Sequence, residues 1–359
     1  MNEYCVLYAI LAALALYVRS KGEKADGKLI RNVNLICFVC VLILLMFRHK
    51  TMGRDLSGVA WIGYLNFFDR VAGQTVYYAL FKALHFEFGF TLFVKLVSVL
   101  WQNHQFFIAV TAFVSLAPIA VLIGKKSRDP AFSWIIYTSL MPFFLLYSGL
   151  RQGIAIGIAA IAFILAEERK LLLFIITVLV AASFHTSAVL LFLIYPIMNL
   201  QVNVKWRAIA VAVLPLLILV CKVMIKLVIF QFPKYAYVLS ENGRGSYRYF
   251  LMLLAVYFFC CVFTNNSRFQ NAYLNLFYIA CLFQMLGLFS ETAPRAGFYF
   301  VLSLAVLLPD VIENIEKRGI SVLSYFGAVV CFILLGFYCI YTTDWAMAYP
   351  YYWFWETVV

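Results

Sequence analysis

Charged residues are scarce in this chain: Asp, Glu, Lys and Arg make up only 12% of its 359 residues. Together with 65% hydrophobic residues and 35 Phe, so low a charged fraction excludes a water-soluble globular domain. The apolar runs are continuous and mostly long enough to cross a ~30 Å hydrocarbon layer as helices, whereas a β-barrel would show alternating segments of about ten residues. We therefore predict an all-α, polytopic integral membrane protein.

The sequence also has little that could hold a metal ion or a nucleotide. Its four His form no H-x-x-x-H pair, its aspartates form no D-x-D, and no P-loop occurs. We therefore expect no metal site and no cofactor, and we do not expect ATP to drive the protein directly.

Lys and Arg outnumber Asp and Glu by 28 to 16, and their distribution sets the predicted topology. The loop 19–31 carries five basic residues and is predicted to be cytoplasmic. The run 4–18 lacks a basic N-terminus and is predicted to be the first span, not a cleavable signal. We predict a single transmembrane domain over residues 1–359. Its spans, about twelve in number, lie near residues 4–18, 33–47, 105–123, 131–149, 150–166, 171–184, 187–200, 207–230, 249–263, 271–289, 296–309 and 321–341; the region 171–200 is either two helices meeting at 183–187 or one helix broken there.

Residues 48–103 are predicted to be an extracytoplasmic segment between the second and third spans. The segment contains a moderately apolar stretch, 88–101, that is short for a span and carries Lys95 at its centre. Counting this stretch as a span would move the cations at 125–128 to the outside, against the positive-inside rule. We therefore predict a helix that lies in the outer membrane interface.

Eleven Lys and Arg remain on the predicted outer side, although the positive-inside rule should deplete them there. A multiply charged anion at the outer membrane surface is the simplest partner for them. The alternative for the lysines is that their ammonium groups extend to the lipid headgroups, and it applies to Lys50, Lys82, Lys95 and Lys234.

Arginines are the better anion ligands, because a planar guanidinium binds phosphate oxygens in a bidentate way that an ammonium cannot copy. Arg151 follows a predicted turn and opens a helix, where free N–H groups and the helix dipole favour an anion. Arg295 occupies a similar place after a proline. The other candidates are Arg48, Arg54 and Arg248. The alternative for Arg151 is a salt bridge between helices, and for Arg48 and Arg54 it is pairing with Asp55.

Candidate bases are few. His185 lies at the predicted outer end of a hydrophobic hairpin, where an imidazole can take a proton from an attacking hydroxyl. Glu87 and Asp55 could do the same work or bind sugar hydroxyls. The alternative for His185 is a histidine that only holds the turn at 184–187. Together, these groups suggest an enzyme that acts on a lipid-linked polyanion.

An ordered set of short motifs carries a resemblance. The motifs are R-x4-G-R-D…Y-L-N-F-F (Arg48 to Phe68, with Tyr64 opening its second part), E-x-G-F (Glu87 to Phe90), S-G-L-R-Q-G-I-A (Ser148 to Ala155), F-H-T-S-A (Phe184 to Ala188) and P-R-x-x-x-Y (Pro294 to Tyr299). In this order they resemble the EpsG family, Wzy-like exopolysaccharide and capsule polymerases of bacteria, over residues 48 to 300.

The resemblance implies a metal-independent glycosyltransferase with a GT-C-like helical arrangement in the bacterial cytoplasmic membrane, its active site facing outward. The implied partners are an undecaprenyl-diphosphate-linked oligosaccharide donor and acceptor, membrane lipid and other polysaccharide assembly proteins; no nucleic acid is expected. The growing glycan would pass from its lipid diphosphate to the non-reducing end of a lipid-linked repeat unit. Arginines such as Arg151 would hold the diphosphate, and Gln152, Tyr64 and Tyr299 of the motifs would contact substrate.

Two other function classes stay open. A flippase or transporter of lipid-linked oligosaccharide also needs basic residues and a hydrophobic groove, but the sequence shows no internal repeat and no charge ladder crossing the membrane. An outward-facing polysaccharide acyltransferase would also use His and Arg.

Overall fold

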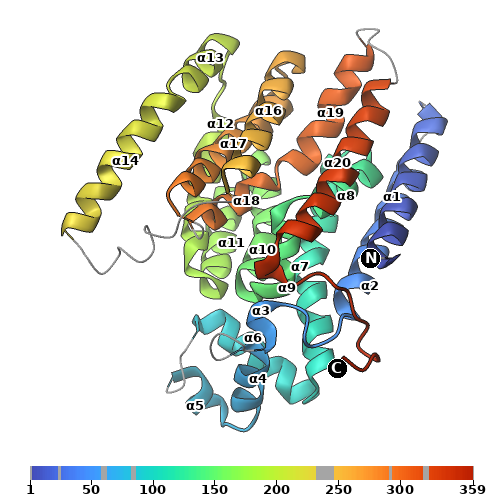
Figure 1. Cartoon of the computed structure of the whole chain (residues 1–359), viewed down its shortest axis with the longest axis vertical. Coiled ribbons are helices and arrows are strands. Elements are labelled where there is room, and N and C mark those ends of the chain that lie inside the picture. Colours follow the sequence, from blue (N-terminus) through green and yellow to red (C-terminus); the bar gives the residue numbers. More distant parts are fainter. Residues whose placement is uncertain are drawn as a thin grey trace. The chain divides into compact units, whose positions relative to one another are not determined.

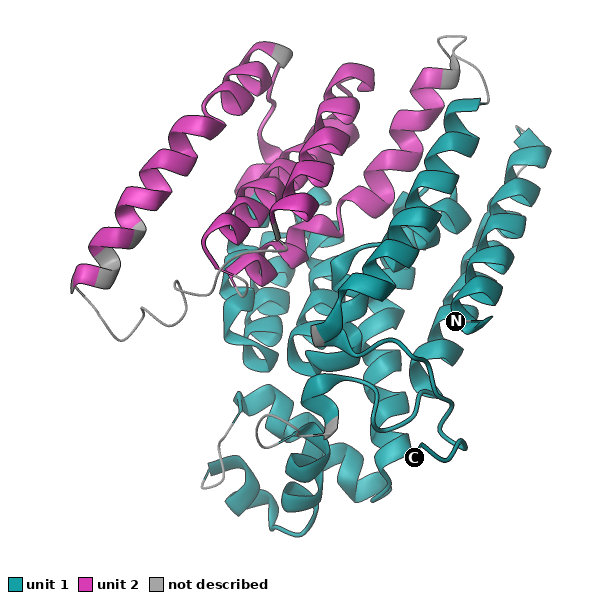
Figure 2. Cartoon of the chain, in the orientation of Figure 1, with its two compact units in different colours: residues 1–195, 321–359 teal, residues 196–320 magenta. Residues whose placement is uncertain are grey.

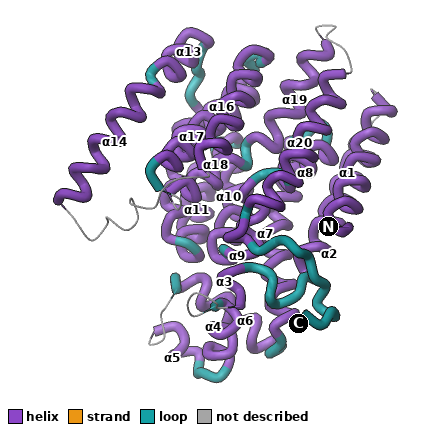
Figure 3. Tube along the Cα trace, in the orientation of Figure 1, coloured by secondary structure: helices purple, strands orange, loops and turns teal. Residues whose placement is uncertain are grey.

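The computed structural model describes residues 2–22, 26–57, 63–81, 86–231, 246–290, 293–317 and 323–358. Within these ranges the chain is a succession of helices joined by short loops, and no strand is formed (Figure 1, Figure 3). An isolated β-bridge joins Arg48 and Trp353. The all-α prediction is confirmed for the described part of the chain.

Two compact units make up the chain, and Figure 2 colours them separately. The first comprises residues 1–195 and 321–359, and the second comprises residues 196–320. The single transmembrane domain over 1–359 stays a prediction, and each unit is described by itself below.

In the first unit, α10 packs against α7 and α11, α2 packs against α7, and α8 packs against α1 and α20. The helices of this unit are α1 (Asn2–Lys21), α2 (Gly27–Met46), α3 (Arg54–Ser57), α4 (Tyr64–Ala72), α5 (Val76–Phe81), α6 (Phe88–Leu100), α7 (His104–Lys126), α8 (Pro130–Thr138), α9 (Met141–Ser148), α10 (Leu150–Glu167), α11 (Leu171–Phe184), the 3-10 helix η2 (Thr186–Leu193), α20 (Leu323–Thr342) and the 3-10 helix η6 (Asp344–Ala346). Helix α12 (Ile194–Asn199) crosses from the first unit into the second.

In the second unit, α17 packs against α16 and α19. The remaining elements of this unit are α13 (Val204–Ala212), α14 (Leu214–Gln231), α16 (Ser246–Phe263), α17 (Arg268–Met285), η4 (Leu286–Leu288), η5 (Ala293–Gly297), α18 (Phe298–Val301) and α19 (Leu304–Lys317).

Among the described residues, six helices are long and apolar enough to cross a membrane: α1, α2, α7, α10, α20 and the helix over Arg268–Leu288. Three bent pairs, α8 with α9, α13 with α14, and η5–α18 with α19, raise the number to nine if each pair is one span. The other predicted spans correspond to shorter apolar helices. The prediction of about twelve spans is therefore not confirmed, and the GT-C-like arrangement stays a prediction.

Proline accounts for two of the three bends. The α8–α9 pair bends by 61° and the α13–α14 pair by 42°. In each case the second helix has a proline at its second position, Pro142 and Pro215. A proline has no N–H to donate to the preceding turn and its ring clashes with that turn, so the helix restarts in a new direction. The predicted spans 131–149 and 207–230 are thus each broken.

The region 171–200 forms two helical segments that meet within 183–187, which is the first of the two predicted alternatives. Helix α11 ends at Phe184, the backbone of His185 is extended, and η2 begins at Thr186. This junction places the imidazole of His185 beside the backbone N–H of Thr186 at the end of an apolar helix.

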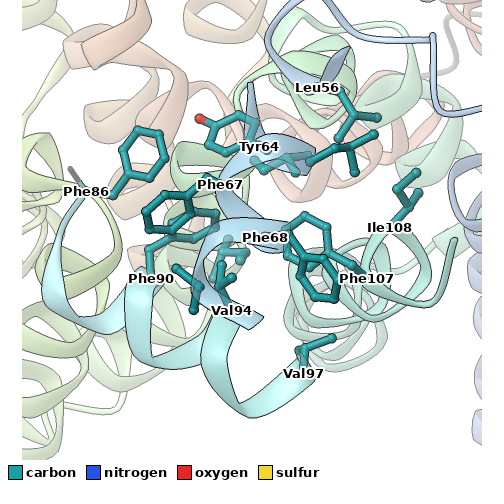
Figure 4. Close-up of a cluster of buried hydrophobic side chains, with 14 of the residues drawn as sticks. Leu56, Tyr64, Phe67, Phe68, Phe86, Phe90, Val94, Val97, Phe107 and Ile108 are labelled. Carbon is teal, nitrogen blue, oxygen red and sulfur yellow. The ribbon is translucent and has the colours of Figure 1, made fainter. Parts of the chain in front are cut away.

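Helices α3 to α6 form a small layer with its own aromatic core, which also includes the start of α7 (Figure 4). The rings of Phe67 and Phe86 meet edge-on at 4.6 Å between centroids, and those of Phe68 and Phe107 lie 5.0 Å apart. Buried aromatic pairs prefer particular ring geometries, and these stabilise a core in addition to the burial of its apolar surface. The core therefore fixes the position of Glu87, which follows Phe86 in the chain.

Lys95 does not extend to the lipid headgroups as the alternative proposed. Its side chain is buried, and its ammonium donates to the carbonyl oxygens of Val71, Ala72 and Gln74 at 3.2, 3.2 and 2.7 Å. These carbonyls lie at the C-terminal end of α4, where a helix leaves acceptors unpaired and a positive charge is favoured. The three N–H donors of Lys95 match three such acceptors, so this cation has a structural role.

Residues 343–358 fold back from the end of α20 onto the loop that follows α2. His49 N donates to Tyr352 O at 2.8 Å, and Phe354 N donates to Phe47 O at 2.9 Å. The hydroxyl of Tyr351 donates to Leu44 O at 2.8 Å. The loop after α2 is therefore held by chain that lies about 300 residues later.

Candidate functional site

Glu87, Arg151 and His185 lie in direct contact in the first unit. Glu87 is the N-cap residue of α6, but its carboxylate does not bond to its own helix. Oε2 accepts a hydrogen bond from Arg151 Nη1 at 2.5 Å. Oε1 accepts from Thr186 N at 3.0 Å and lies 3.3 Å from His185 Nδ1. Three segments that are far apart in the chain thus meet at one carboxylate.

Arg151 lies in the first turn of α10, between an aromatic ring and a hydroxyl. Its guanidinium carbon is 4.3 Å from the centroid of the Phe86 ring, a cation–π distance. Its Nε donates to the Tyr64 hydroxyl at 3.3 Å. The side chains of Arg151, Glu87 and His185 keep 21%, 17% and 25% of their surface exposed. The cluster is therefore rigidly held and still open to a ligand.

Glu87 is held in its ionised form. Burial alone would raise the pKa of this carboxyl group, but hydrogen bonds from His185 and Thr186 and the charge of Arg151 outweigh burial and hold the pKa well below its usual range. A carboxylate this acidic and this fully bonded is a poor proton acceptor. It is suited to orienting the imidazole and balancing the guanidinium charge.

His185 is oriented by its Nδ1 contact. Because Glu87 is ionised, the tautomer that fits carries the proton on Nδ1 and donates it to Oε1. The other ring nitrogen, Nε2, then presents a lone pair, and it has no hydrogen-bond partner among the residues that the structure describes. This arrangement of carboxylate, imidazole and free Nε2 is that of a general base with its orienting group.

Glycine in the E-x-G-F motif lets α6 approach α11 closely. A Cβ on Gly89 would lie 2.1 Å from Ser183 Oγ and 2.8 Å from Ser183 O. The approach brings Glu87 within reach of Thr186 and His185 just beyond the end of α11. The motif thus combines a functional carboxylate with the small residue that positions it.

Gly89→Ala is therefore expected to push α6 away from α11 and to lower activity about 10-fold or more, at a stability cost of about 1–3 kcal/mol. Activity and thermal unfolding of the purified variant measure the two effects. Gly73→Ala is the matched control, because a Cβ there meets nothing closer than 3.9 Å. Equal activity of the two variants would show that the close approach is not needed.

Arg48 has a different role from the one predicted. Its side chain is 1% exposed, and its guanidinium donates to Leu146 O at 2.9 Å and Tyr147 O at 3.4 Å. Burial lowers the pKa of Arg48 to about 10. Since these carbonyls end α9, Arg48 caps that helix, and we leave it out of the diphosphate ligands proposed below.

The loop before α3 and the start of α3, which carries Arg54 and Asp55, are held against the C-terminal end of α9. Arg54 N donates to Ser148 Oγ at 2.8 Å. Gly53 has a φ of +103°, and a Cβ there would lie 1.9 Å from Tyr147 O, so only glycine fits. The Arg54 side chain is exposed, and Asp55 is close enough to Tyr64 to contribute to its raised pKa, which burial raises most.

The other predicted residues fall into two groups. Gln152 is 6% exposed in the first unit, beside Arg151 in α10. Arg248, Arg295 and Tyr299 belong to the second unit, in α16, η5 and α18; Arg248 is exposed and Tyr299 is buried. Their roles stay predictions. Lys82 and Lys234 lie outside the described residues.

Two site residues were not predicted from the sequence. Thr186 donates to Glu87 Oε1 through its N–H and, at 3.2 Å, through its hydroxyl, and Phe86 lies under the guanidinium of Arg151. Thr186 lies within the F-H-T-S-A motif and Phe86 directly precedes the E-x-G-F motif, so their nearness to predicted residues in the chain was the available signal. Among the described residues, no group of three His, Cys, Asp or Glu side chains could hold a metal ion.

Comparison with known proteins identifies the family of the chain. No curated protein and no solved structure matches the chain. The model of the EpsG family matches residues 33–353, which is nearly the whole chain and includes every motif of the site. The chain therefore belongs to the EpsG family, and this membership indicates an exopolysaccharide polymerase-type membrane protein.

Proposed function

We propose that the protein transfers a growing glycan from undecaprenyl diphosphate to the non-reducing end of a lipid-linked repeat unit at the outer face of the bacterial cytoplasmic membrane. The observation that carries this proposal is the contact of Glu87, Arg151 and His185. It supplies a cation for a diphosphate and an oriented base for a hydroxyl within one small cluster.

In this reaction His185 Nε2 takes the proton of the acceptor hydroxyl as its oxygen attacks the anomeric carbon of the donor glycan. The bond between that carbon and the diphosphate oxygen breaks, and the electron pair leaves on the lipid diphosphate. Glu87 stabilises the imidazolium that forms, because its carboxylate lies 3.3 Å from Nδ1.

Arg151 stabilises the charge that develops on the leaving diphosphate. One of its N–H groups is bonded to Glu87 and one to Tyr64, so the guanidinium is fixed while further donors remain for phosphate oxygens. The fixed positive charge of Arg151 would replace a metal ion in stabilising the leaving diphosphate. Arg54 is proposed as a further diphosphate ligand, and Asp55, Gln152 and Tyr64 as contacts to the sugar units; the roles of Arg248, Arg295 and Tyr299 in the second unit stay predictions.

Incubation of the purified protein with defined lipid-linked repeat units tests the reaction class. A ladder of longer glycans is the result expected of a polymerase. Movement of intact lipid-linked sugars between leaflets of a vesicle, without a ladder, would indicate a flippase, and a mass gain by acyl units would indicate an acyltransferase.

The proposed orientation predicts which of two exposed positions can be reached from outside the cell. Lys50 follows the C-terminal end of α2, and Arg128 follows the C-terminal end of α7. In a background with the exposed thiols of Cys5 and Cys331 removed, Lys50→Cys is expected to react with a membrane-impermeant maleimide in whole cells and Arg128→Cys only after permeabilisation. The reverse pattern would place the site on the cytoplasmic side.

A further inference from the structure

Three exposed aromatic side chains lie beside the site on α5 and α6, in the first unit. Tyr77, Phe81 and Phe88 are 65%, 58% and 48% exposed. The ring centroids of Tyr77 and Phe81 are 5.4 Å apart, and those of Phe81 and Phe88 are 6.4 Å apart. We call these three residues the aromatic patch. Large exposed apolar surfaces of this kind mark binding sites or membrane contacts.

The aromatic patch adjoins the proposed anion site along the chain. Phe88 follows Glu87 directly, and Phe86, on the other side of Glu87, lies under the guanidinium of Arg151. Helix α5 carries no charged residue over Val76–Phe81. Exposed aromatic surface therefore begins at Phe88, the residue directly after the carboxylate that binds Arg151.

We infer that the aromatic patch binds the first isoprene units of a polyprenyl diphosphate. In such a lipid the diphosphate is bonded directly to the end of the hydrocarbon chain. A protein that holds this anion must therefore offer an apolar surface within a few ångströms of the anion ligands, or leave the first isoprene units in water. The patch meets this requirement, and it offers few polar groups for a sugar. The inference rests on the proposed function and names one part of its substrate.

The rest of the exposed face of α6 provides an internal comparison. Val99 is 68% exposed and lies on the same face of α6 as Phe88, about three turns further along the helix. Bulk membrane lipid would contact both ends of the face equally. A polyprenyl diphosphate anchored at Arg151 would contact the Phe88 end first.

Photocrosslinking tests the inference directly. The probe is a polyprenyl diphosphate with a diazirine on its second isoprene unit, added to the full-length protein in vesicles, and the labelled residues are mapped by mass spectrometry. Labelling is expected in 77–81 and at Phe88, and excess unlabelled undecaprenyl diphosphate is expected to abolish it while excess phosphatidylglycerol does not. Labelling that reaches Val99 equally, or that undecaprenyl diphosphate fails to reduce, would show bilayer contact only and overturn the inference.

Paired variants supply the kinetic test. Phe81→Ser and Phe88→Ser are expected to raise KM for the lipid-linked donor about 5- to 30-fold, with kcat changed little, because each loses one apolar contact with the chain. Val99→Ser is the matched control and is expected to leave KM unchanged. Labelling elsewhere in the protein that unlabelled undecaprenyl diphosphate abolishes would refute binding at the aromatic patch but not the proposed function. The absence of any such labelling would count against both.

Discussion

His185→Ala is expected to polymerise about 10²- to 10⁴-fold more slowly than the wild type, the usual contribution of a positioned general base. Binding of the lipid-linked donor is expected to persist, because Arg151 and its contacts with Glu87 and Tyr64 stay in place. Single-turnover rates and donor binding, measured on the same purified protein, separate the two effects.

The pH dependence distinguishes a base from a residue that only holds the turn. The wild-type rate is expected to fall on the acid side, because a general base acts only in its unprotonated form, and His185→Ala is expected to lose this limb of the profile. Glu87 does not produce it, because its depressed pKa keeps the carboxylate ionised in the range where the enzyme is assayed. Full activity of His185→Ala would move the base to Asp55 or elsewhere.

Chelation belongs to the same prediction. If the guanidinium of Arg151 does the work of a metal ion, EDTA is expected to leave the rate unchanged within about twofold. Loss of activity with EDTA and its recovery with Mg²⁺ or Mn²⁺ would refute the proposal that arginine replaces a metal, whatever the His185 variant shows.

Arg151→Lys is expected to lower polymerisation about 10- to 1000-fold, which corresponds to roughly 1.4 to 4 kcal/mol of transition-state stabilisation. Lysine keeps the positive charge beside Glu87 but loses the planar fork and the Nε bond to Tyr64. The rate constant for glycan transfer at saturating donor is the measurement, with the amount of folded protein in the membrane determined in parallel.

Arg70→Lys is the matched control for this variant. Arg70 is exposed in the last turn of α4, in the same part of the chain as Tyr64. A general need for arginine charge at this surface would lower both rates alike. Wild-type polymerisation by Arg151→Lys would mean that the arginine is only an ion-pair partner of Glu87.

The sequence was sufficient to select Glu87, Arg151 and His185, because ionisable groups stand out in an apolar chain and cost free energy to place there. It could not show that they meet. The hydrogen bonds that join them connect residues 64 and 98 positions apart, and neither helical periodicity nor turn signals report such distances. The close approach at Gly89 is visible only once α6 and α11 are placed.

Sequence reasoning could not separate ligand cations from structural ones. Arg48 and Lys95 looked like members of a surface charge excess, yet both are bonded to the carbonyls at helix ends. A sequence shows which residues can donate hydrogen bonds but not which carbonyls lack a donor. The span count was limited in the same way, because helix length was predicted from apolar runs that Pro142 and Pro215 divide.

The contact between residues 343–358 and the loop after α2 has a consequence for the order of events during synthesis. Residues 47–54 are made early, but the backbone groups that pair with His49 and Phe47 are made about 300 residues later. The backbone groups of Phe47 and His49 in the loop before α3 therefore lack these partners until the end of the chain has been made, and contacts of such long sequence separation are slow to form. The loop before α3 is therefore expected to be completed only after α20 has been made, and truncation of the chain before residue 347 is expected to leave the backbone groups of Phe47 and His49 without these partners.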